Sequence, residues 1–433
     1  MENLDYARLQ MAFTLGFHII FACIGMVMPF FMIVAHRRWL KTKNPLYLKL
    51  TKAWLKGVAI FFVTGAVSGT ALSFELGMLW PEFMKHAGPI IGMPFSLEGA
   101  AFFVEAIALG FYLYGWNRLP EKFHWFTGVI IGISGVASGI LVVSANGWMN
   151  APSGFDYVDG DFINIDPVKA LLNPAWFTQA LHMTLAAFVA TSFAVAGIHA
   201  YQVLRGNHPQ LHKEAFKIAA FFGGIAAILQ PLSGDLSAKD VAERQPAKLA
   251  AMEAHYETEI GAPLFIGGVV DEENKEVNHK IEIPNALSFL AFGDFDAEVK
   301  GLNEFPEDEI PPVSIVHYAF QVMVGIGTLL MLSGLLFFIS LKKKSWSNNR
   351  KYWWFFMLLA PLGFVALEAG WVVTEVGRQP WIIYQVMRTS EAVTPMPGMK
   401  FSFYMYVVVY ITLAFTVTWL MKRQIKALNA DTK

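Results

Sequence analysis

Apolar residues gather in long blocks along this chain, and charged residues fall between the blocks. A helix needs about 20 apolar residues to cross the hydrocarbon core of a bilayer. Nine blocks meet or approach this length: 9–35, 58–80, 95–116, 126–145, 175–204, 216–232, 313–341, 353–376 and 401–421. Lipid offers no water to the backbone, so each block is expected to be helical. The sixth block is the weakest, because it is short and contains Pro231. The pattern predicts an all-α integral membrane protein of about nine transmembrane helices.

The charges between the blocks alternate and predict an orientation, because basic loops favour the cytoplasm. The basic loop residues are Arg37, Arg38, Lys41, Lys43, Lys49, Lys52, Lys56, Arg118, Lys122, Arg205, Lys213, Lys342, Lys343, Lys344, Lys422, Arg423 and Lys426. The alternate loops are acidic or neutral. One of them contains Asp156, Asp159, Asp161 and Asp166. The longest loop, 233–310, has 18 Asp or Glu against 6 Lys or Arg. The N-terminus is therefore expected outside and the C-terminus in the cytoplasm.

This alternation divides the chain into three parts. Residues 1–232 would form helices one to six, and 233–310 an extracytoplasmic loop. Residues 311–433 would form helices seven to nine with a short cytoplasmic tail. The apolar run that begins at Leu9 is too long for the core of a cleavable signal peptide.

Composition narrows the class further. Of 433 residues, 55% are hydrophobic and 15% are charged, whereas soluble domains carry roughly a quarter charged residues. A net charge of −1 gives no indication of a nucleic-acid partner. The only cysteine, Cys23, excludes an intrachain disulfide, a covalently attached c-type haem and cysteine-based zinc or iron–sulfur sites.

Five ionisable residues fall inside the apolar blocks, where a charge is costly and often marks function. They are His18, Glu98, Glu105, His182 and Glu368. Each has a simpler interpretation: a lone buried His often makes structural hydrogen bonds, and Glu98 could lie at a helix end in water. Met323 would be a packing residue if it stood alone. Ionisable residues on four different spans are nevertheless hard to explain as packing.

Depth brings several of these residues together. At a rise of 1.5 Å per residue, four of them lie roughly 10–15 Å below the outer surface: His18, His182, Met323 and Glu368. Four polar or aromatic residues lie at or just above this layer: Arg8, Asn146, Trp148 and Arg378. Imidazole, thioether and carboxylate groups with cations above them are what haem iron and haem propionates require.

A second pattern concerns protons. Glu98 and Glu105 are seven residues apart and therefore share one helix face, as do Glu368 and Glu375. A buried carboxyl group can carry a proton. Glu105 lies deeper than Glu98, so the pair could lead protons outward toward the layer of candidate ligands.

Taken in order along the chain, these residues resemble subunit I of cytochrome bd quinol oxidases. The matching segments are Arg8-Leu9-Gln10, His18, Ser96-Leu97-Glu98-Gly99, Glu105, Ala145-Asn146-Gly147-Trp148-Met149, His182, Met323, Glu368-Ala369-Gly370-Trp371 and Gly377-Arg378-Gln379-Pro380-Trp381. The resemblance implies three haems. His182 and Met323 would hold a low-spin b haem. His18 and Glu368 would each hold one of the other two, a high-spin b haem and a haem d or further b-type haem, with the assignment between them open.

The resemblance also implies roles for the remaining residues. Glu98 would border the oxygen-binding iron, and Glu105 with Ser138 would belong to a proton route from the cytoplasm. In the long loop, Lys248 and Glu253 resemble a quinol-binding pair, although without the family they would be interpreted as an exposed helical salt bridge.

The family implies an activity and partners. Quinol would be oxidised at the outer face and O2 reduced to water with cytoplasmic protons, which generates proton motive force without pumping. A second membrane subunit and a small single-helix subunit are expected in the bacterial inner membrane. Some positions depart from the family pattern. The loop is short, Gln321 stands where some members have Arg, and Phe364 where some have Trp.

Three other classes compete with this interpretation. A proton- or cation-coupled transporter could use the same His and Glu residues as a relay, but it would leave Met323 without a role, and no internal repeat is found. A haem–copper oxidase needs paired histidines on facing helices, and His18, His182, His199 and His317 are not expected to pair. A non-catalytic membrane subunit would leave the buried ionisable residues unexplained.

Overall fold

The computed structural model of the chain describes residues 2–430 except Asp159 and Lys344. Those two residues, which contributed to the predicted loop charges, lie outside the described part. Within it, nine helical segments are long and apolar enough to span a membrane, as predicted. They are α1 (Glu2–Thr42), α2 (Pro45–Leu79), α3 (Pro81–Tyr114), α4 (Glu121–Asn150), α6 (Trp176–Leu204), α7 (Pro209–Arg244), α10 (Val313–Lys342), α11 (Arg350–Leu358) with α12 (Leu362–Val376) as one span, and α14 (Met399–Ala430).

Proline and capping residues define several helix starts. Asn44 accepts a hydrogen bond from the Leu46 N–H, and Pro45 occupies the first turn of α2. Proline is tolerated there because the first N–H groups of a helix have no partner inside it. Pro81 begins α3 in the same way, directly after Trp80. The chain therefore turns back within a few residues between α1 and α2 and between α2 and α3.

The weak sixth block is a full helix. Helix α7 continues through Pro231 and ends at Arg244, twelve residues beyond the predicted end at 232. A proline removes one backbone donor, and its neighbours can satisfy the freed carbonyl groups. The segment that joins α7 to α10 is correspondingly shorter than the predicted loop 233–310.

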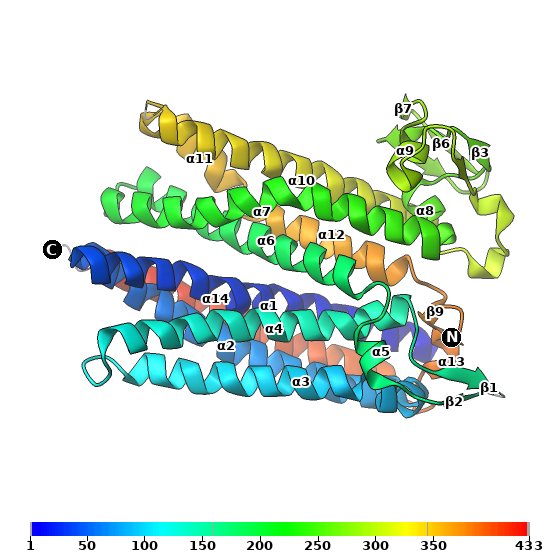
Figure 1. Ribbon diagram of the computed structural model, residues 1–433, viewed down its shortest axis with the longest axis horizontal. Coiled ribbons are helices and arrows are strands. Elements are labelled where there is room, and N and C mark those ends of the chain that lie inside the picture. Colours follow the sequence, from blue (N-terminus) through cyan, green and yellow to red (C-terminus); the bar gives the residue numbers. More distant parts are fainter. Residues whose placement is uncertain (1, 159, 344, 431–433) are drawn as a thin grey trace.

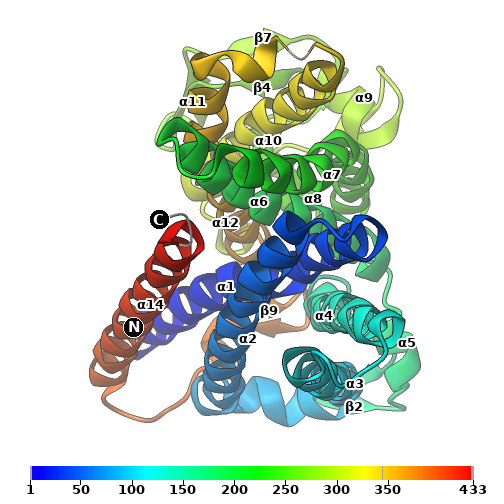
Figure 2. The ribbon, with the colours of Figure 1, turned by 90° about the vertical axis from the view of Figure 1, so that its left-hand side faces the viewer.

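The membrane helices form two groups (Figure 2). Helices α1, α2, α3, α4 and α14 pack together, and α6, α7, α10, α11 and α12 form the second group. Helices α1 and α4 join the groups because both also contact α6. Gly128, Gly132, Gly135 and Gly139 form one face of α4. A Cβ at each of them would touch a side chain of α1 or α3, so these glycines allow close approach.

Most of the short elements gather at one end of the bundle (Figure 1). The short helices are α5 (Pro167–Leu171), α8 (Pro246–Glu253), α9 (Ala286–Phe292), α13 (Thr389–Ala392) and the 3-10 turns Leu302–Glu304, Glu307–Glu309 and Trp346–Asn348. The strands are β1 (Asp156–Val158), β2 (Asp161–Ile163), β3 (Glu259–Ile260), β4 (Leu264–Ile266), β5 (Val269–Asp271), β6 (Glu276–Asn278), β7 (Ile281–Ile283), β8 (Glu298–Val299), β9 (Trp381–Ile383) and β10 (Met387–Arg388). They pair antiparallel as β1–β2, β3–β8, β4–β7, β5–β6 and β9–β10.

The N-terminus lies at the end that holds most of these short elements, and the C-terminus lies at the opposite end (Figure 1). The segment between α7 and α10 is on the N-terminal side. The relative placement of these parts agrees with the predicted alternation.

Candidate functional site

His18 on α1 lies against α2. Its Nδ1 is 2.9 Å from the hydroxyl of Ser68. A Cβ at Gly69 would lie 3.1 Å from the imidazole ring. The absence of a side chain at Gly69 therefore leaves room for the ring between the two helices.

His182 on α6 lies against α7 in a similar way. Its Nδ1 is 3.0 Å from the hydroxyl of Ser233, and the amide nitrogen of Gln230 is 3.2 Å from Nε2. A Cβ at Gly234 would lie 3.7 Å from the ring. Both candidate histidines thus combine a serine partner with an adjacent glycine on the neighbouring helix.

Glu368 is on α12, and Met323 on α10 packs against the same helix. A Cβ at Gly16 on α1 would lie 3.0 Å from Glu368 Oε2, and a Cβ at Gly370 would lie 3.0 Å from Met323 Sδ. Glu368 therefore faces α1 at Gly16. His18 is two residues further along the same helix. This proximity supports the predicted layer.

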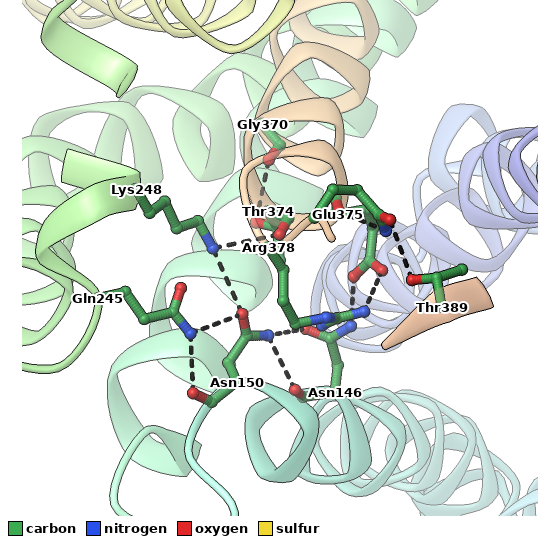
Figure 3. Close-up of polar contacts among 10 residues, drawn as sticks. Asn146, Asn150, Gln245, Lys248, Gly370, Thr374, Glu375, Arg378 and Thr389 are labelled. Carbon is green, nitrogen blue, oxygen red and sulfur yellow. Dashed lines mark hydrogen bonds and ion pairs between the residues drawn. The ribbon is translucent and has the colours of Figure 1, made fainter. Parts of the chain in front are cut away.

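A polar network lies at the ends of α4 and α12 (Figure 3). Arg378 donates from Nη2 to Glu375 Oε2 at 2.6 Å, and Asn146 donates to the other oxygen of Glu375. Asn150 donates to the side chain and carbonyl oxygens of Asn146. Lys248 Nζ donates to Asn150 Oδ1 at 3.3 Å and to the Thr374 carbonyl at 3.1 Å. Asn150 therefore joins the candidate residues for haem propionates to the candidate residue for quinol.

The unpaired polar atoms fit a haem environment. Arg378 is 2% exposed, and its Nε and Nη1 are buried with no hydrogen-bond partner in the described chain. Two guanidinium donors of this kind match a carboxylate such as a haem propionate. Glu368 Oε1 is also buried and unpartnered among the described residues. The donor set of two imidazoles, one thioether and one carboxylate fits haem iron.

Arg8 and Trp148 differ in whether their side-chain hydrogen-bond donors are free. Arg8 is partly buried and makes no hydrogen bond or ion pair with other described residues. Trp148 is fully buried, and its indole N–H donates to the Ser153 carbonyl at 2.9 Å. Arg8 therefore keeps its donors free for an anion, whereas Trp148 has already used its only donor.

Lys248 and Glu253 lie on α8, buried to 5% and 3% exposure. No ion pair joins them in the described structure, so the alternative interpretation as an exposed salt bridge is wrong. Burial, with a smaller contribution from Arg378, lowers the pKa of Lys248 to about 7. Burial raises the pKa of Glu253 to about 8. Both groups can exchange protons near neutral pH.

A small pocket opens beside this network. Its wall includes Lys248, Arg378, Trp381, Phe305 and Tyr384. Aromatic side chains combined with a few convergent polar groups are typical of sites for small apolar ligands with polar ends. Glu253 does not line this pocket.

The carboxylates of α3 face α4. Ser138 donates to Glu98 Oε1 at 2.8 Å. A Cβ at Gly135, one turn earlier on α4, would lie 3.5 Å from both oxygens of Glu105. Glu105 is 6% exposed. The two carboxylates therefore follow one seam between helices, with Ser138 bonded to Glu98.

The two departures from the family pattern have structural contexts. Gln321 donates to the Phe265 carbonyl at 2.9 Å, and its Oε1 accepts from the Gly267 N–H at 3.2 Å. It therefore ties α10 to strand β4 and the residue after it. Phe364 packs against the main apolar core.

The expectation that the membrane histidines do not pair is wrong for His199. Its Nδ1 lies 2.8 Å from the Nδ1 of His212, because the short turn between α6 and α7 brings them together. His36 and His124 also make ring contact. Among the residues the structure describes, no three His, Cys, Asp or Glu residues form a group that could hold a metal ion. The pair is therefore no indication of a copper site.

Sequence reasoning missed two groups. Glu75 on α2 is fully buried and accepts hydrogen bonds from Gln10 and Thr14. A carboxylate inside an apolar block was the signal for it. Asn150 and Gln245 gave no such signal, since amides are common at helix ends, and only the tertiary structure places them beside Lys248.

Comparisons with known proteins identify relatives that match this chain over almost its whole length. A Bacillus subtilis protein provisionally described as cytochrome bd menaquinol oxidase subunit I is 36% identical, with 97% of this chain and 96% of the relative covered. A Bacillus subtilis cytochrome bd ubiquinol oxidase subunit 1 is 31% identical, covering 98% and 94%. In the solved bd oxidase of Geobacillus thermodenitrificans, one chain matches with a TM-score of 0.93 and 36% identity, covering 98% of each chain.

The family profile extends over almost the whole chain, from residue 6 to residue 429. All nine candidate spans lie within or overlap this range. The chain therefore belongs to the family of cytochrome bd terminal oxidase subunit I.

Proposed function

We propose that this chain is the haem-bearing catalytic subunit of a terminal quinol oxidase, with quinol oxidised beside Lys248 at the outer face. The observation that carries this proposal is the network that joins Lys248 to Arg378 through Asn150 (Figure 3). It connects a pocket for a small ligand with a guanidinium that has unpaired donors. The family is that of bd oxidases, which excludes a haem–copper enzyme.

Four side chains would hold iron. His182 and Met323 would hold a low-spin b haem, and His18 and Glu368 would each hold one of two further haems, of b and d or both b type. Arg378 and Arg8 would pair with propionates, which their unpaired donors support. When bound, the haems supply electron transfer and the reduction of O2.

Lys248 and Glu253 would receive protons from quinol. Oxidation of one quinol releases two electrons and two protons, so two quinols supply the four electrons that convert one O2 into two waters. A neutral Lys248 amine or an ionised Glu253 carboxylate can accept a proton, and their pKa values of about 7 and 8 allow this near neutral pH. Asn150 and the Thr374 carbonyl orient the amine.

Glu105, Glu98 and Ser138 would carry the protons that O2 reduction consumes. The Glu98–Ser138 hydrogen bond and the position of Glu105 two turns deeper in the same seam support this route. Because the protons would come from the cytoplasm, turnover would generate proton motive force without pumping.

The arrangement in the bacterial plasma membrane follows from the charge alternation. Residues 1–244 and 313–433 would contain the membrane helices, and 245–312 the outer quinol-binding loop. Family membership implies a complex with a second membrane subunit, and we propose a small single-helix subunit as a further partner. Trypsin added to right-side-out membranes should cut at the exposed Lys275 and spare the exposed Lys351. Cleavage at Lys351 but not at Lys275 would show that the membrane orientation is the opposite of the predicted one.

Replacing Met323 with Leu tests the ligand assignment. Leucine keeps the volume but lacks the sulfur, so the low-spin haem should become high-spin or be lost while the other haems remain. The reduced-minus-oxidised spectrum of the purified complex measures this change. Met331→Leu, on the same helix, is the matched control and should leave the spectrum as it is. An unchanged spectrum in Met323→Leu would contradict the assignment.

A further inference from the structure

The two histidines proposed as iron ligands share one hydrogen-bonding arrangement. His18 Nδ1 lies 2.9 Å from Ser68 Oγ, and His182 Nδ1 lies 3.0 Å from Ser233 Oγ. Each serine is on the neighbouring helix and is buried, at 0% and 1% exposure. A neutral imidazole has one protonated nitrogen and one lone pair. The serine hydroxyl proton therefore decides which nitrogen carries the lone pair.

In both cases the hydroxyl proton is already used. Ser68 Oγ is 2.9 Å from the Thr64 carbonyl, and Ser233 Oγ is 2.8 Å from the Gln230 carbonyl. A carbonyl oxygen can only accept a hydrogen bond, so each serine donates to its own helix. Each hydroxyl must then accept from the imidazole, which places the ring proton on Nδ1. The lone pair is left on Nε2 of both histidines.

Gln230 also lies against the ring of His182. Its amide nitrogen, which can only donate, is 3.2 Å from Nε2 and 3.2 Å from the His182 carbonyl oxygen. The same nitrogen is 3.3 Å from Nδ1, so Gln230 lies at nearly equal distances from the two ring nitrogens. The serine contact therefore decides between the tautomers. On binding iron, Nε2 would exchange this donor for the metal, while the bond from Gln230 to the carbonyl can persist.

We infer that Ser68 and Ser233 are positioning residues that fix the tautomer, ring orientation and basicity of His18 and His182. This inference rests on the proposed function, in which both histidines bind iron. A hydrogen bond from Nδ1–H to a fixed acceptor increases the electron donation from Nε2. Stronger donation stabilises the oxidised iron more than the reduced iron. Each serine therefore lowers the reduction potential of the haem beside it.

Ser233→Ala tests this inference at the low-spin haem. Loss of the acceptor should raise the midpoint potential and broaden the electron paramagnetic resonance signal, because the ring is no longer held in one orientation. Ser233→Thr keeps a hydroxyl that can bond to the helix carbonyl. Its midpoint potential and its signal should be those of the unmodified complex. Ser333→Ala is the matched control, since Ser333 is 1% exposed and donates to the Leu329 carbonyl at 2.7 Å. It should change neither property.

Two results would overturn the inference. One is an unchanged potential and signal in a haem-replete Ser233→Ala variant. If that variant does not assemble, Ser233→Cys supplies a weaker acceptor and should give a higher potential than Ser233→Thr; equal potentials would then overturn it. His182→Ala tests the underlying ligand assignment separately. Retention of the low-spin haem there would refute the proposed ligand, whatever the serine variants show.

Ser68→Ala extends the test to His18. The iron–histidine stretching frequency of the reduced haem that His18 would hold, measured by resonance Raman spectroscopy, should fall because Nε2 becomes a weaker donor. Ser68→Thr should restore it. A frequency that is the same in Ser68→Ala and the unmodified complex would remove Ser68 from this role.

Discussion

The network around Asn150 and the carboxylate seam between α3 and α4 both place polar groups in an otherwise apolar bundle. In the network, Lys248, Asn146, Glu375 and Arg378 are held by side chains and carbonyls from three helices. In the seam, Glu98 has Ser138 as a partner, whereas Glu105 makes no hydrogen bond or ion pair with the other described residues.

This difference corresponds to two kinds of task. A site that orients a ligand needs fixed charges, and its hydrogen bonds supply that order. A group that passes protons must change its protonation state. A rigid ion pair would hold such a group in its charged form. The seam therefore should depend on the ability to ionise, and the network should depend on geometry. The following predictions test this contrast in order of decreasing effect.

Glu105→Gln should produce the largest loss. The amide keeps the shape and hydrogen-bonding capacity of the carboxyl but cannot ionise, so oxygen consumption should fall about 10²-fold while haem content is retained. An oxygen electrode and a haem spectrum measure both properties. Glu82→Gln, an exposed change on the same helix, should be near normal. Full turnover in a haem-replete Glu105→Gln variant would mean that Glu105 only packs.

Lys248→Met should lower quinol oxidation about tenfold, since loss of a hydrogen bond to a charged or polar group costs on the order of 1.5 kcal/mol. Reduction of the haems by a small artificial donor should continue, because that donor bypasses the pocket. Lys239→Met removes an exposed lysine of α7 and serves as the control. Equal losses with both donors would place Lys248 outside the quinol site.

Asn150→Ala should have a smaller effect of several-fold, mainly as a higher KM for quinol. Lys248 would lose one acceptor but keep the Thr374 carbonyl, and Gln245 would keep the Asn150 carbonyl. Steady-state kinetics with quinol measure the change. The exposed Asn164→Ala variant should behave like the unmodified protein. A large loss of kcat with unchanged KM would show that Asn150 does more than orient the amine.

The smallest effect concerns pH. Above its pKa of about 7, Lys248 is neutral and can accept a proton. Above its pKa of about 8, Glu253 is ionised and can do the same. Quinol oxidation should therefore rise a few-fold between pH 7 and 8. Lys248→Met should keep only the upper step, and Glu253→Gln only the lower. A profile that is the same in all three proteins would exclude both groups.

Some features of the site could be predicted because their signals are local. Hydropathy predicted nine spans. The sixth, α7, is longer than predicted, because Pro231 costs one hydrogen bond without ending the helix. The seven-residue spacing placed Glu98 and Glu105 on one face of α3, as both contacts with α4 indicate. The depth estimate placed Glu368 near the level of His18, which the approach of Glu368 to Gly16 supports.

Other features depend on which helices meet and how they are rotated. Spacing within one helix cannot tell that Ser68 and Ser233 reach two imidazoles, that Asn150 joins Lys248 to Asn146, or that His199 meets His212. It also suggested an exposed ion pair for Lys248 and Glu253, which α8 instead buries separately. The sequence by itself determined the spans and the chemical groups within each, since these follow from composition and helical period. Only the tertiary structure decided the partners of those groups, because a hydrogen bond between helices depends on a few ångströms of packing that no single helix encodes.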